Sequence, residues 1–455
     1  MAEKFAHLNS AKLTTKEGFE CSCGAHHTMY VKYLNVGSGA VNYVADAVKA
    51  IGATYPMVVC APDTYEPAAK KVDELLTLAD IKHKTFIIPD QGLEKLEPAE
   101  FTTGSVVLNF DQNCDLIIGV GSGVVNDTCR VVSTTAKIPE LIIGTAPSMD
   151  GYASASSSMV VNNIKQSLSL KAPEGIILDT DIMKEAPMKL LAAGLGDMLA
   201  KYTALCEWKL AKLLRGEAYC EEVAALVQNA LDKVVSNASG LKDRDPAAVE
   251  AVAEGLVSSG IGMAFVGHSR PASGLDHYFS HAWEMMALSR GKNYELHGIQ
   301  VGLGTLYAVM MLQKLKTIKP TLEHVEEANK KFSKEAWEAN IHRVFGPTAD
   351  GIIAMEERLQ KNEPNGRLER AKKIIDNWDE VVRIIDESVP SVETIRKIMV
   401  DAGLPTSYEG IDVTKQDAID AFVCSRDIRD KYLTSSLIWD IGYMDEFAEW
   451  LESQI

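Results

Sequence analysis

Four of the ten histidines lie close together in the sequence, at His268, His277, His281 and His297. Pro and Gly within residues 271–274 predict a turn, and the apolar periodicity that follows predicts a helix beginning just after it. On such a helix His277 and His281 are four residues apart and share one face. Imidazoles presented in this way are typical ligands of a divalent metal, so this segment is the first candidate for chemistry.

Two further ligands are available elsewhere in the chain. His297 follows a Gly-Lys-Asn loop and begins another apolar run, and Asp197 stands at the head of a helical pattern within residues 194–201. One carboxylate and two imidazoles with an open position make a catalytic site of the zinc or Fe(II) kind. A histidine pair on a helix is, however, more often a surface or core feature, so the spacing alone leaves both interpretations open.

The composition is that of a soluble globular protein of two or three domains, with 46% apolar and 24% charged residues among 455. The net charge of −17 argues against nucleic acid or an anionic membrane as the main partner. We expect no apolar run as long as a membrane span and no signal peptide. Most of the eight cysteines lie in apolar runs and are expected to be reduced, which predicts a cytoplasmic protein.

Cysteine and histidine are concentrated in the segment Cys-Ser-Cys-Gly-Ala-His-His at residues 21–27. Its C-x-C pair followed closely by two histidines lacks the paired spacing of a structural zinc site. We therefore predict a strand and a hairpin turn here, with metal binding as the less favoured alternative.

Short β-branched runs alternate with helical stretches from about residue 30 to 180, which predicts βαβ units and a parallel sheet. Beyond residue 184 helical periodicity dominates to the C-terminus. The predicted strands are 56–60, 84–89, 115–119 and 140–144. The predicted helices lie near 39–51, 65–79, 124–136, 196–212, 219–235, 246–260 and 298–315.

These patterns predict an α/β Rossmann-like nucleotide-binding domain followed by an all-α domain. We place the first domain at residues 1–185 and the helical metal- and substrate-binding domain at 186–455. Within the second, residues 320–395 are rich in charged side chains and are interpreted as a peripheral helical insertion.

A glycine-rich turn, Gly121-Ser-Gly123, follows the third predicted strand and precedes a helix. Glycines there allow the backbone to approach a pyrophosphate, whose charge then meets the N–H groups of the helix start. Val124 stands where the third glycine of the usual dinucleotide motif would be. A tight βα connection is the alternative, but the position after a strand favours nucleotide binding.

Two other strand ends carry polar groups. Asp63 follows the first predicted strand and could bind ribose hydroxyls, favouring NAD over NADP, or could equally be a helix N-cap. Residues 144–158 form a predicted loop of small and hydroxyl-bearing side chains at the carboxyl end of the fourth strand. We expect this loop to line a ligand-binding cleft, with Asp150 directed at the substrate.

Together these motifs resemble the family of sn-glycerol-1-phosphate dehydrogenases. That family lies within the superfamily of iron-containing alcohol dehydrogenase, glycerol dehydrogenase and dehydroquinate synthase. The resemblance covers about residues 20–315, with a weaker match at 429–434, and implies a dehydroquinate-synthase-like fold. Its strongest matches are the turn at 121–127, the loop at 145–150, Gly196-Asp197 and the segment 270–281.

The resemblance implies a catalytic metal held by Asp197, His277 and His297, with zinc as the first expectation and nickel or iron as alternatives. It also implies a dinucleotide site. Besides Asp63 and Gly121, the residues expected to contact the dinucleotide are Gly123, Val124, Val125, Asn126, Asp127, Thr145, Ala146, Pro147, Ser148 and Ser154.

The implied reaction is the reversible reduction of dihydroxyacetone phosphate to sn-glycerol 1-phosphate with NADH or NADPH, a step toward glycerophospholipids. Asp150, Asp197 and His281 would face the substrate, with His281 as the proton donor. Arg270 could grip the phosphate with two parallel hydrogen bonds or could form an ion pair that steadies its turn. Lys171 is a weaker alternative for the phosphate.

We expect a homo-oligomer, a dimer or larger, without nucleic-acid binding or membrane insertion. Three alternatives to this function stay open on sequence alone. They are a glycerol or other polyol dehydrogenase, a dehydroquinate-synthase-like lyase, and a nucleotide sensor without catalysis.

Overall fold

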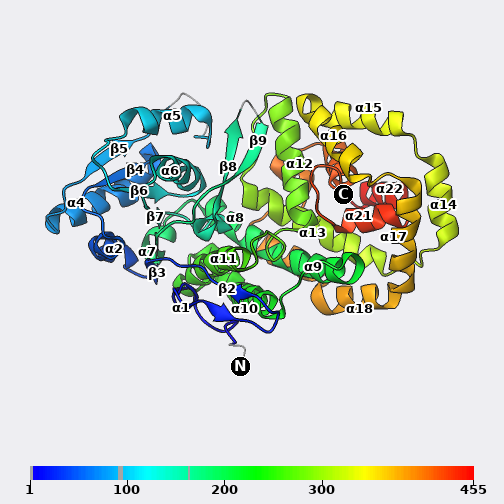
Figure 1. Cartoon of the computed structure of the whole chain (residues 1–455), viewed down its shortest axis with the longest axis horizontal. Helices are drawn as coiled ribbons and strands as arrows, with labels where there is room; N and C mark the ends of the chain where they lie inside the picture. Colours follow the sequence, from blue (N-terminus) through cyan, green and yellow to red (C-terminus); the bar gives the residue numbers. More distant parts are fainter. Residues whose placement is uncertain (1–3, 91–95, 162–163) are drawn as a thin grey trace. The chain divides into compact units, whose positions relative to one another are not determined.

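The computed structural model in Figure 1 describes residues 4–90, 96–161 and 164–455. The chain folds into two compact units. Unit 1 comprises Met1–Met198 and Cys220–Ser269, and unit 2 comprises Leu199–Tyr219 and Arg270–Ile455. A single division after residue 185 was expected. The difference arises because two long helices after Cys220 pack on each other and on other elements of unit 1.

Unit 1 is built on a six-stranded sheet in which every neighbouring pair is parallel. The order is β3-β10-β7-β6-β4-β5. The strands are β3 (Tyr33–Gly37), β4 (Pro56–Cys60), β5 (Lys84–Ile87), β6 (Leu116–Gly121), β7 (Glu140–Gly144) and β10 (Gly175–Asp179). The four predicted strands are confirmed, whereas β3 and β10 were missed, because a run of five residues does not by itself distinguish strand from helix.

Helices cover both faces of this sheet, as βαβ connections require. Those of the βαβ region are α2 (Val44–Ile51), α3 (Pro62–Thr64), α4 (Lys70–Leu78), α5 (Glu100–Asn109) and α6 (Gly123–Ala136), with the turns η1 (Ala40–Tyr43) and η2 (Tyr65–Ala69). The remaining elements of the unit are α1 (Ser10–Leu13), η3 (Asp150–Ala153), α7 (Thr180–Met183), α8 (Met188–Leu199), α10 (Glu221–Asn237), η4 (Ala238–Asp243) and α11 (Pro246–Val266).

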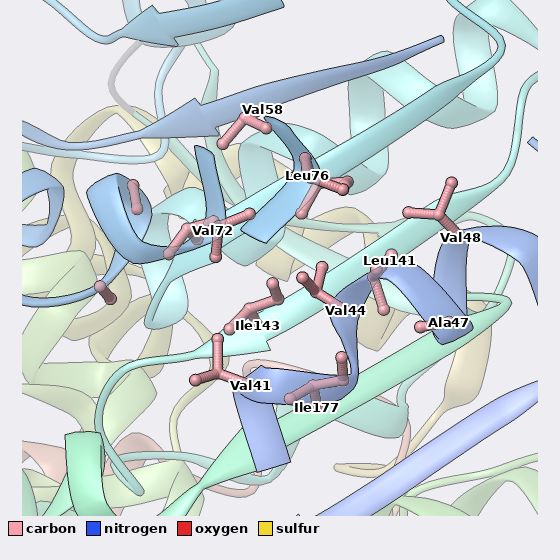
Figure 2. Close-up of a cluster of buried hydrophobic side chains, with 14 of the residues drawn as sticks. Val41, Val44, Ala47, Val48, Val58, Val72, Leu76, Leu141, Ile143 and Ile177 are labelled. Atoms are coloured by element: carbon pink, nitrogen blue, oxygen red, sulfur yellow. The ribbon is translucent and has the colours of Figure 1, made fainter. Parts of the chain in front are cut away.

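Alternate residues of each strand enter opposite cores, as the period of two requires. Val58 and Ile143 pack with Val44 and Leu76 on the face covered by α2 and α4, as Figure 2 shows. Their chain neighbours Met57 and Val59 pack instead with Val125, Cys129 and Val106 on the face covered by α5 and α6. The inner strands of the sheet are therefore buried on both sides, which leaves the strand ends as the places where ligands can reach their backbone.

The hydroxyl-rich segment predicted as one loop is partly a strand. Residues 145–155 form the loop and η3, but β8 (Ser156–Val161) then pairs antiparallel with β9 (Ile164–Ser169). The prediction was wrong for residues 156–158 because serine has little strand preference of its own and here acquires a partner strand.

Unit 2 consists of helices, as predicted. They are α9 (Lys201–Arg215), α12 (Leu275–Ser289), α13 (His297–Leu315), α14 (Leu322–Lys331), α15 (Lys334–Phe345), α16 (Ala349–Leu359), α17 (Pro364–Asp376), α18 (Trp378–Ser388), α19 (Val392–Asp401), α20 (Lys415–Cys424), α21 (Thr434–Asp440) and α22 (Met444–Gln454), with the turns η5 (Gly346–Thr348) and η6 (Tyr408–Ile411).

Two expectations about helices are corrected. Residues 196–212 are not one helix: α8 ends at Leu199 and α9 begins at Lys201, so Asp197 lies in the last turn of a helix and not at its head. The predicted helix start therefore lies inside α8. In addition, α11 is long and apolar enough to cross a membrane, contrary to expectation, although 72% of its most apolar window is buried within the structure.

The buried cation Arg130 joins three segments of unit 1. From α6 its guanidinium donates to Oδ1 of Asn126 and, across a 3.2 Å ion pair, to Glu140 at the start of β7. It also donates to the backbone carbonyls of Gly151, Tyr152 and Ser156. Each N–H bond of a buried guanidinium needs an acceptor, so these bonds tie the loop after β7 to α6.

We predict that Arg130→Ala lowers the free energy of unfolding of unit 1 by about 3–5 kcal/mol, because it leaves the buried Glu140 without its counter-charge. All six tryptophans lie in unit 2. Far-ultraviolet circular dichroism during urea unfolding should therefore show an earlier transition that tryptophan fluorescence does not report. Arg383→Ala, which removes an exposed cation between Glu380 and Glu387, is the control and should change neither signal. Equal effects of the two substitutions would contradict the prediction.

Candidate active site

The glycine turn lies where β6 passes into α6. A side chain on Gly121 would come within 2.5 Å of Val125, so only glycine allows α6 to start so close to the strand. Val125 itself belongs to the core, and Asn126 is fully buried with its side chain bonded to Arg130. These two predicted cofactor residues therefore present backbone rather than side chain at the helix start. Backbone N–H groups at a helix N-terminus suit a phosphate.

The loop after β7 is bonded to this turn. The backbone N–H of Thr145 donates to the carbonyl of Gly121 at 3.1 Å, and the hydroxyls of Ser122 and Ser148 are 2.5 Å apart. Tyr152 holds the same loop by donating to the Ala146 carbonyl. The structure thus brings together the two predicted groups of dinucleotide residues, and it adds Ser122, which the sequence analysis did not single out.

Other predicted cofactor residues have structural partners in unit 1. Ser154 bonds to the hydroxyl and the N–H of Ser156 and so starts β8. Burial raises the pKa of Asp127 to about 6, against the opposing charge of Arg130. Their contacts with a dinucleotide stay predictions.

Asp63 is exposed directly after β4, the strand next to β6 in the sheet. The alternative that it is a helix N-cap is wrong: the N-cap of α3 is Ala61, and the residue that bonds back to its N–H is Thr64. Thr64 also donates to the carbonyl of Val120 in β6. Since carboxyl ends of parallel strands meet at one edge, the carboxylate lies on the same edge as the glycine turn, as ribose binding requires.

Asp197 and Asp150 are connected within unit 1. The N–H of Asp150 donates to Oδ2 of the fully buried Asp197 at 2.9 Å, and the hydroxyl of Ser259 on α11 donates to the Asp150 carboxylate at 2.9 Å. Gly194 makes this possible, because a side chain there would lie 1.7 Å from the carbonyl oxygen of Pro147. Close packing of α8 on the loop after β7 thus positions both acids.

The three candidate histidines converge in unit 2. His277 and His281 lie one turn apart on α12, as predicted, and His297 is the first residue of α13, one residue before the predicted start of that helix. The centre of the His297 ring is 5.2 Å from that of His277 and 5.9 Å from that of His281. Gly304 permits this approach, since a side chain there would collide with the Asp276 carbonyl on α12.

Buried acids determine where α12 begins. The N–H of Leu275 donates to Oε2 of Glu207 on α9, and the N–H groups of Gly274 and His277 donate to Oδ1 of Asp276. Carboxylates at a helix N-terminus satisfy its unpaired N–H groups and suit its dipole. Burial and the neighbouring Asp276 raise the pKa of Glu207 to about 7.

Each of the three rings has an oxygen beside Nδ1. Nδ1 of His277 pairs with Asp276, and Nδ1 of His297 lies 3.2 Å from the hydroxyl of Ser280. The two carboxylate oxygens of Glu284 lie 3.5 Å from Nδ1 of His281 and 3.6 Å from Nδ1 of His297. Metal-binding histidines usually present one nitrogen to such a partner and the other to the ion. The oxygens beside Nδ1 are those expected behind metal-binding histidines, and binding of a divalent cation through the Nε2 atoms stays a prediction.

Glu284 and Asp276 were missed by the sequence analysis. Glu284 follows His281 by three residues and so shares its helix face, which is a signal that spacing could have shown. Asp276 precedes His277 directly, and its carboxylate contacts the ring only because the helix starts there. Although burial opposes ionisation, bonding to His277 and Thr203 holds the pKa of Asp276 below its usual value.

The positive charge of Arg429 acts on His281. Burial, and then the charge of Arg429, lower the pKa of His281 to about 3, so the free ring is neutral at physiological pH. Lys431, two residues after Arg429 in the sequence, donates to the Ser273 carbonyl at 2.5 Å, in the turn before α12. Burial and the charge of Arg270 lower the pKa of Lys431 to about 7.

Arg270 is bonded within unit 2. Its guanidinium makes a two-pronged pair with Glu217 and donates to the carbonyl of Tyr432 at 2.6 Å. These are the contacts expected of an ion pair that steadies the turn, whereas its phosphate role stays a prediction. Lys171, the weaker alternative, is exposed in unit 1.

Comparisons with known proteins identify the family of this chain. The family described as iron-containing alcohol dehydrogenase matches residues 35–187. A protein of Halalkalibacterium halodurans named glycerol-1-phosphate dehydrogenase (NAD(P)+) is 31% identical over 75% of this chain and 81% of its own. The chain belongs to the glycerol-1-phosphate dehydrogenase family. A family member from Methanosarcina mazei is 35% identical over 60% of this chain and 74% of its own.

Solved structures support the fold of this family member. The glycerol dehydrogenase of Schizosaccharomyces pombe covers 93% of this chain, and the chain covers 91% of it, with a TM-score of 0.59 at 17% identity. An alcohol dehydrogenase from a Red Sea brine pool archaeon covers 95% with a TM-score of 0.56. The predicted resemblance and the predicted fold class are thereby confirmed.

Alanine substitutions of the two histidines of α12 should have different effects on metal binding and turnover. We predict that His277→Ala loses the bound metal, whereas His281→Ala keeps metal and dinucleotide affinity but loses turnover by roughly 10²–10⁴-fold, the usual contribution of acid–base catalysis. The measurement is metal content by elemental analysis beside kcat. His342→Ala, an exposed histidine of α15, should change neither. Metal loss in His281→Ala with retention in His277→Ala would reverse the assignment.

Proposed function

We propose that this chain catalyses the reversible reduction of dihydroxyacetone phosphate to sn-glycerol 1-phosphate with NADH or NADPH. The observation that carries the proposal is the histidine cluster of unit 2, in which His277, His281 and His297 each have an oxygen beside Nδ1. In a member of the glycerol-1-phosphate dehydrogenase family, such a cluster supports carbonyl reduction at a metal centre.

We assign the metal to Asp197, His277 and His297, with zinc as the first expectation and nickel or iron as alternatives. Three protein ligands leave one coordination position for the substrate oxygen, whereas a fourth protein ligand would close the site. When bound, the ion polarises the ketone oxygen, and the nicotinamide supplies the hydride.

His281 is assigned the proton transfer. Because its pKa is held near 3, its protonated form is a strong acid that is scarcely populated at neutral pH. The ring must therefore receive a proton and pass it on within one step, and it must accept the proton of the alcohol in the reverse reaction. Asp150, held by Ser259, is assigned to orient the substrate.

The dinucleotide is assigned to the turn Gly121–Gly123 and the bonded loop at residues 145–148. Backbone N–H groups at the start of α6 would meet the pyrophosphate. Asp63 would bind ribose hydroxyls and repel a 2′-phosphate, which favours NADH over NADPH. We further propose that the enzyme acts in the cytoplasm as a homo-oligomer, and that its product enters glycerophospholipids.

We assign the substrate phosphate to Arg429 and Lys431 in place of Arg270. Arg429 is exposed, and its charge acts on His281, Tyr278 and Lys431. A phosphate lies only a few bonds from the carbonyl that reacts, so its counter-charge must lie near His281. Arg270, by contrast, already pairs with Glu217.

The activity is tested by following NADH oxidation with dihydroxyacetone phosphate and with dihydroxyacetone, in metal-free and metal-reconstituted protein. We expect turnover only with the phosphorylated ketone and only with metal, and slower turnover when NADPH replaces NADH. Preference for dihydroxyacetone would indicate a polyol dehydrogenase. Product release without net NADH consumption would indicate a lyase, and the absence of metal-dependent turnover would favour a nucleotide sensor.

Arg429→Ala tests the phosphate assignment. We predict that KM for dihydroxyacetone phosphate rises roughly 10–100-fold, which corresponds to the loss of about 1.5–3 kcal/mol for a charged hydrogen bond. The slow turnover of an unphosphorylated ketone should not change. In Arg270→Ala, the comparison variant, turnover of both substrates should fall by a similar factor because the turn before α12 is disturbed. A phosphate-selective loss in Arg270→Ala and none in Arg429→Ala would restore the original assignment.

A further inference from the structure

Three cysteines and a histidine from two distant segments meet in unit 1. Cys21 and Cys23 lie in the loop between β1 (Phe19–Glu20) and β2 (His26–His27), and His27 belongs to β2. Strands β1 and β2 pair antiparallel, which confirms the predicted hairpin. Cys220 is the N-cap residue of α10. The three Sγ atoms and one ring nitrogen all lie within 4.8 Å of one another.

The separations of these donor atoms fit a single small cation. Sγ of Cys21 and Sγ of Cys220 are 3.5 Å apart. Nε2 of His27 is 3.3 Å from Sγ of Cys23 and 3.4 Å from Sγ of Cys220. Around a tetrahedral zinc ion with Zn–S of about 2.3 Å and Zn–N of about 2.0 Å, donor atoms are separated by about 3.5–3.8 Å. Little movement is needed to close the four donors around one ion.

His27 is oriented for this role by its surroundings. Its Nδ1 lies 2.8 Å from the backbone carbonyl of Phe265, and its ring stacks on the ring of Phe265. Donation from Nδ1–H leaves the lone pair of Nε2 directed at the thiols, which is the usual arrangement behind a zinc-binding histidine. The ring of Phe5 meets it edge-on and contributes to its burial.

The backbone places the two cysteines of the hairpin. The N–H of Gly24 donates to the carbonyl of Cys21, and the N–H of Cys21 donates to the carbonyl of Ala25. Gly24 has φ of 86°, a conformation that glycine adopts without strain. This tight turn brings Cys21 and Cys23 to one side, opposite Cys220.

We propose that Cys21, Cys23, His27 and Cys220 bind one zinc ion. Three thiolates and one imidazole form a closed four-ligand set, which is typical of structural zinc sites and leaves no position for substrate. Binding releases the three thiol protons. The ion would fasten the N-terminal hairpin to the start of α10, at the point where the chain re-enters unit 1.

Cobalt substitution distinguishes this site from the proposed catalytic one, whose ligands are oxygen and nitrogen. In the full chain reconstituted with CoCl₂, thiolate ligands produce a near-ultraviolet sulfur-to-cobalt charge-transfer band. Asp197, His277 and His297 carry no sulfur and cannot produce this band. We expect the band in the wild type and in His297→Ala, and its loss in Cys23→Ser and Cys220→Ser. With ZnCl₂, elemental analysis should show one ion fewer per chain in Cys23→Ser than in the wild type.

Matched controls lie in the same loop. Ser22→Ala changes an exposed residue between the two cysteines, and His26→Gln changes the neighbouring histidine, whose ring bonds to Glu20. Both should retain the band and the zinc. A band that survives in Cys23→Ser, or no band in the wild type, would overturn the proposal. These outcomes do not depend on catalysis, so they are separate from failure of the proposed function.

A second measurement needs no variant. Titration of the zinc-loaded wild type with an organomercurial should release one zinc ion, detected by a chromogenic chelator, as three thiols react. Release without thiol modification, or a Cys21–Cys220 disulfide in protein kept in reducing buffer, would refute the site. Removal of the ion should also lower the unfolding midpoint of unit 1 by circular dichroism, without changing tryptophan fluorescence, since every tryptophan lies in unit 2.

Discussion

The buried guanidinium of Arg130 is the interaction on which the edge of unit 1 proposed to bind the dinucleotide depends. It donates to five acceptors that belong to α6, to the start of β7 and to the segment from η3 to β8. A fully buried cation is stable only if every N–H bond is paired and its charge is balanced. The three segments are therefore fixed together. Together with the bonds of Thr145 and Ser148 to the glycine turn, this side chain fixes the start of α6 relative to the loop that carries Asp150.

In unit 2 the buried charges near the histidines are negative, in contrast to the buried cation Arg130 of unit 1. Glu207, Asp276 and Glu284 are buried there, and burial alone disfavours their charged forms. Hydrogen bonds from the first N–H groups of α12 stabilise Glu207 and Asp276 in part. A cation at the facing imidazole nitrogens would balance the remaining negative charge. Asp276 and Glu284 thus orient the rings, and the buried carboxylates favour a cation here in a protein whose net charge is −17.

The two metal centres proposed for this chain differ in the chemistry of their donors. Oxygen and nitrogen donors with an open position permit exchange of substrate, whereas three thiolates and one imidazole hold zinc without an open position. The residues proposed for the first set belong to α8, α12 and α13. The second lies at the edge of unit 1, where a short two-stranded hairpin has little hydrophobic core of its own and benefits from a cross-link.

The sequence by itself determined the parallel sheet, because its strands are apolar runs buried on both faces. It also determined the histidine helix, because a spacing of four residues places His277 and His281 on one face. The glycine turn was likewise predicted from its place between a strand and a helix, whereas the structure shows that only glycine fits beside Val125. Tertiary structure alone decided the rest. Strand β10 acquired its identity from pairing with β3 and β7, and Asp197 proved to end a helix that packing on Pro147 positions. Cys220 lies 193 residues from His27, so no local spacing could reveal that their side chains meet. Local patterns report which face of an element is apolar, whereas contacts between distant elements arise only when those faces pack together.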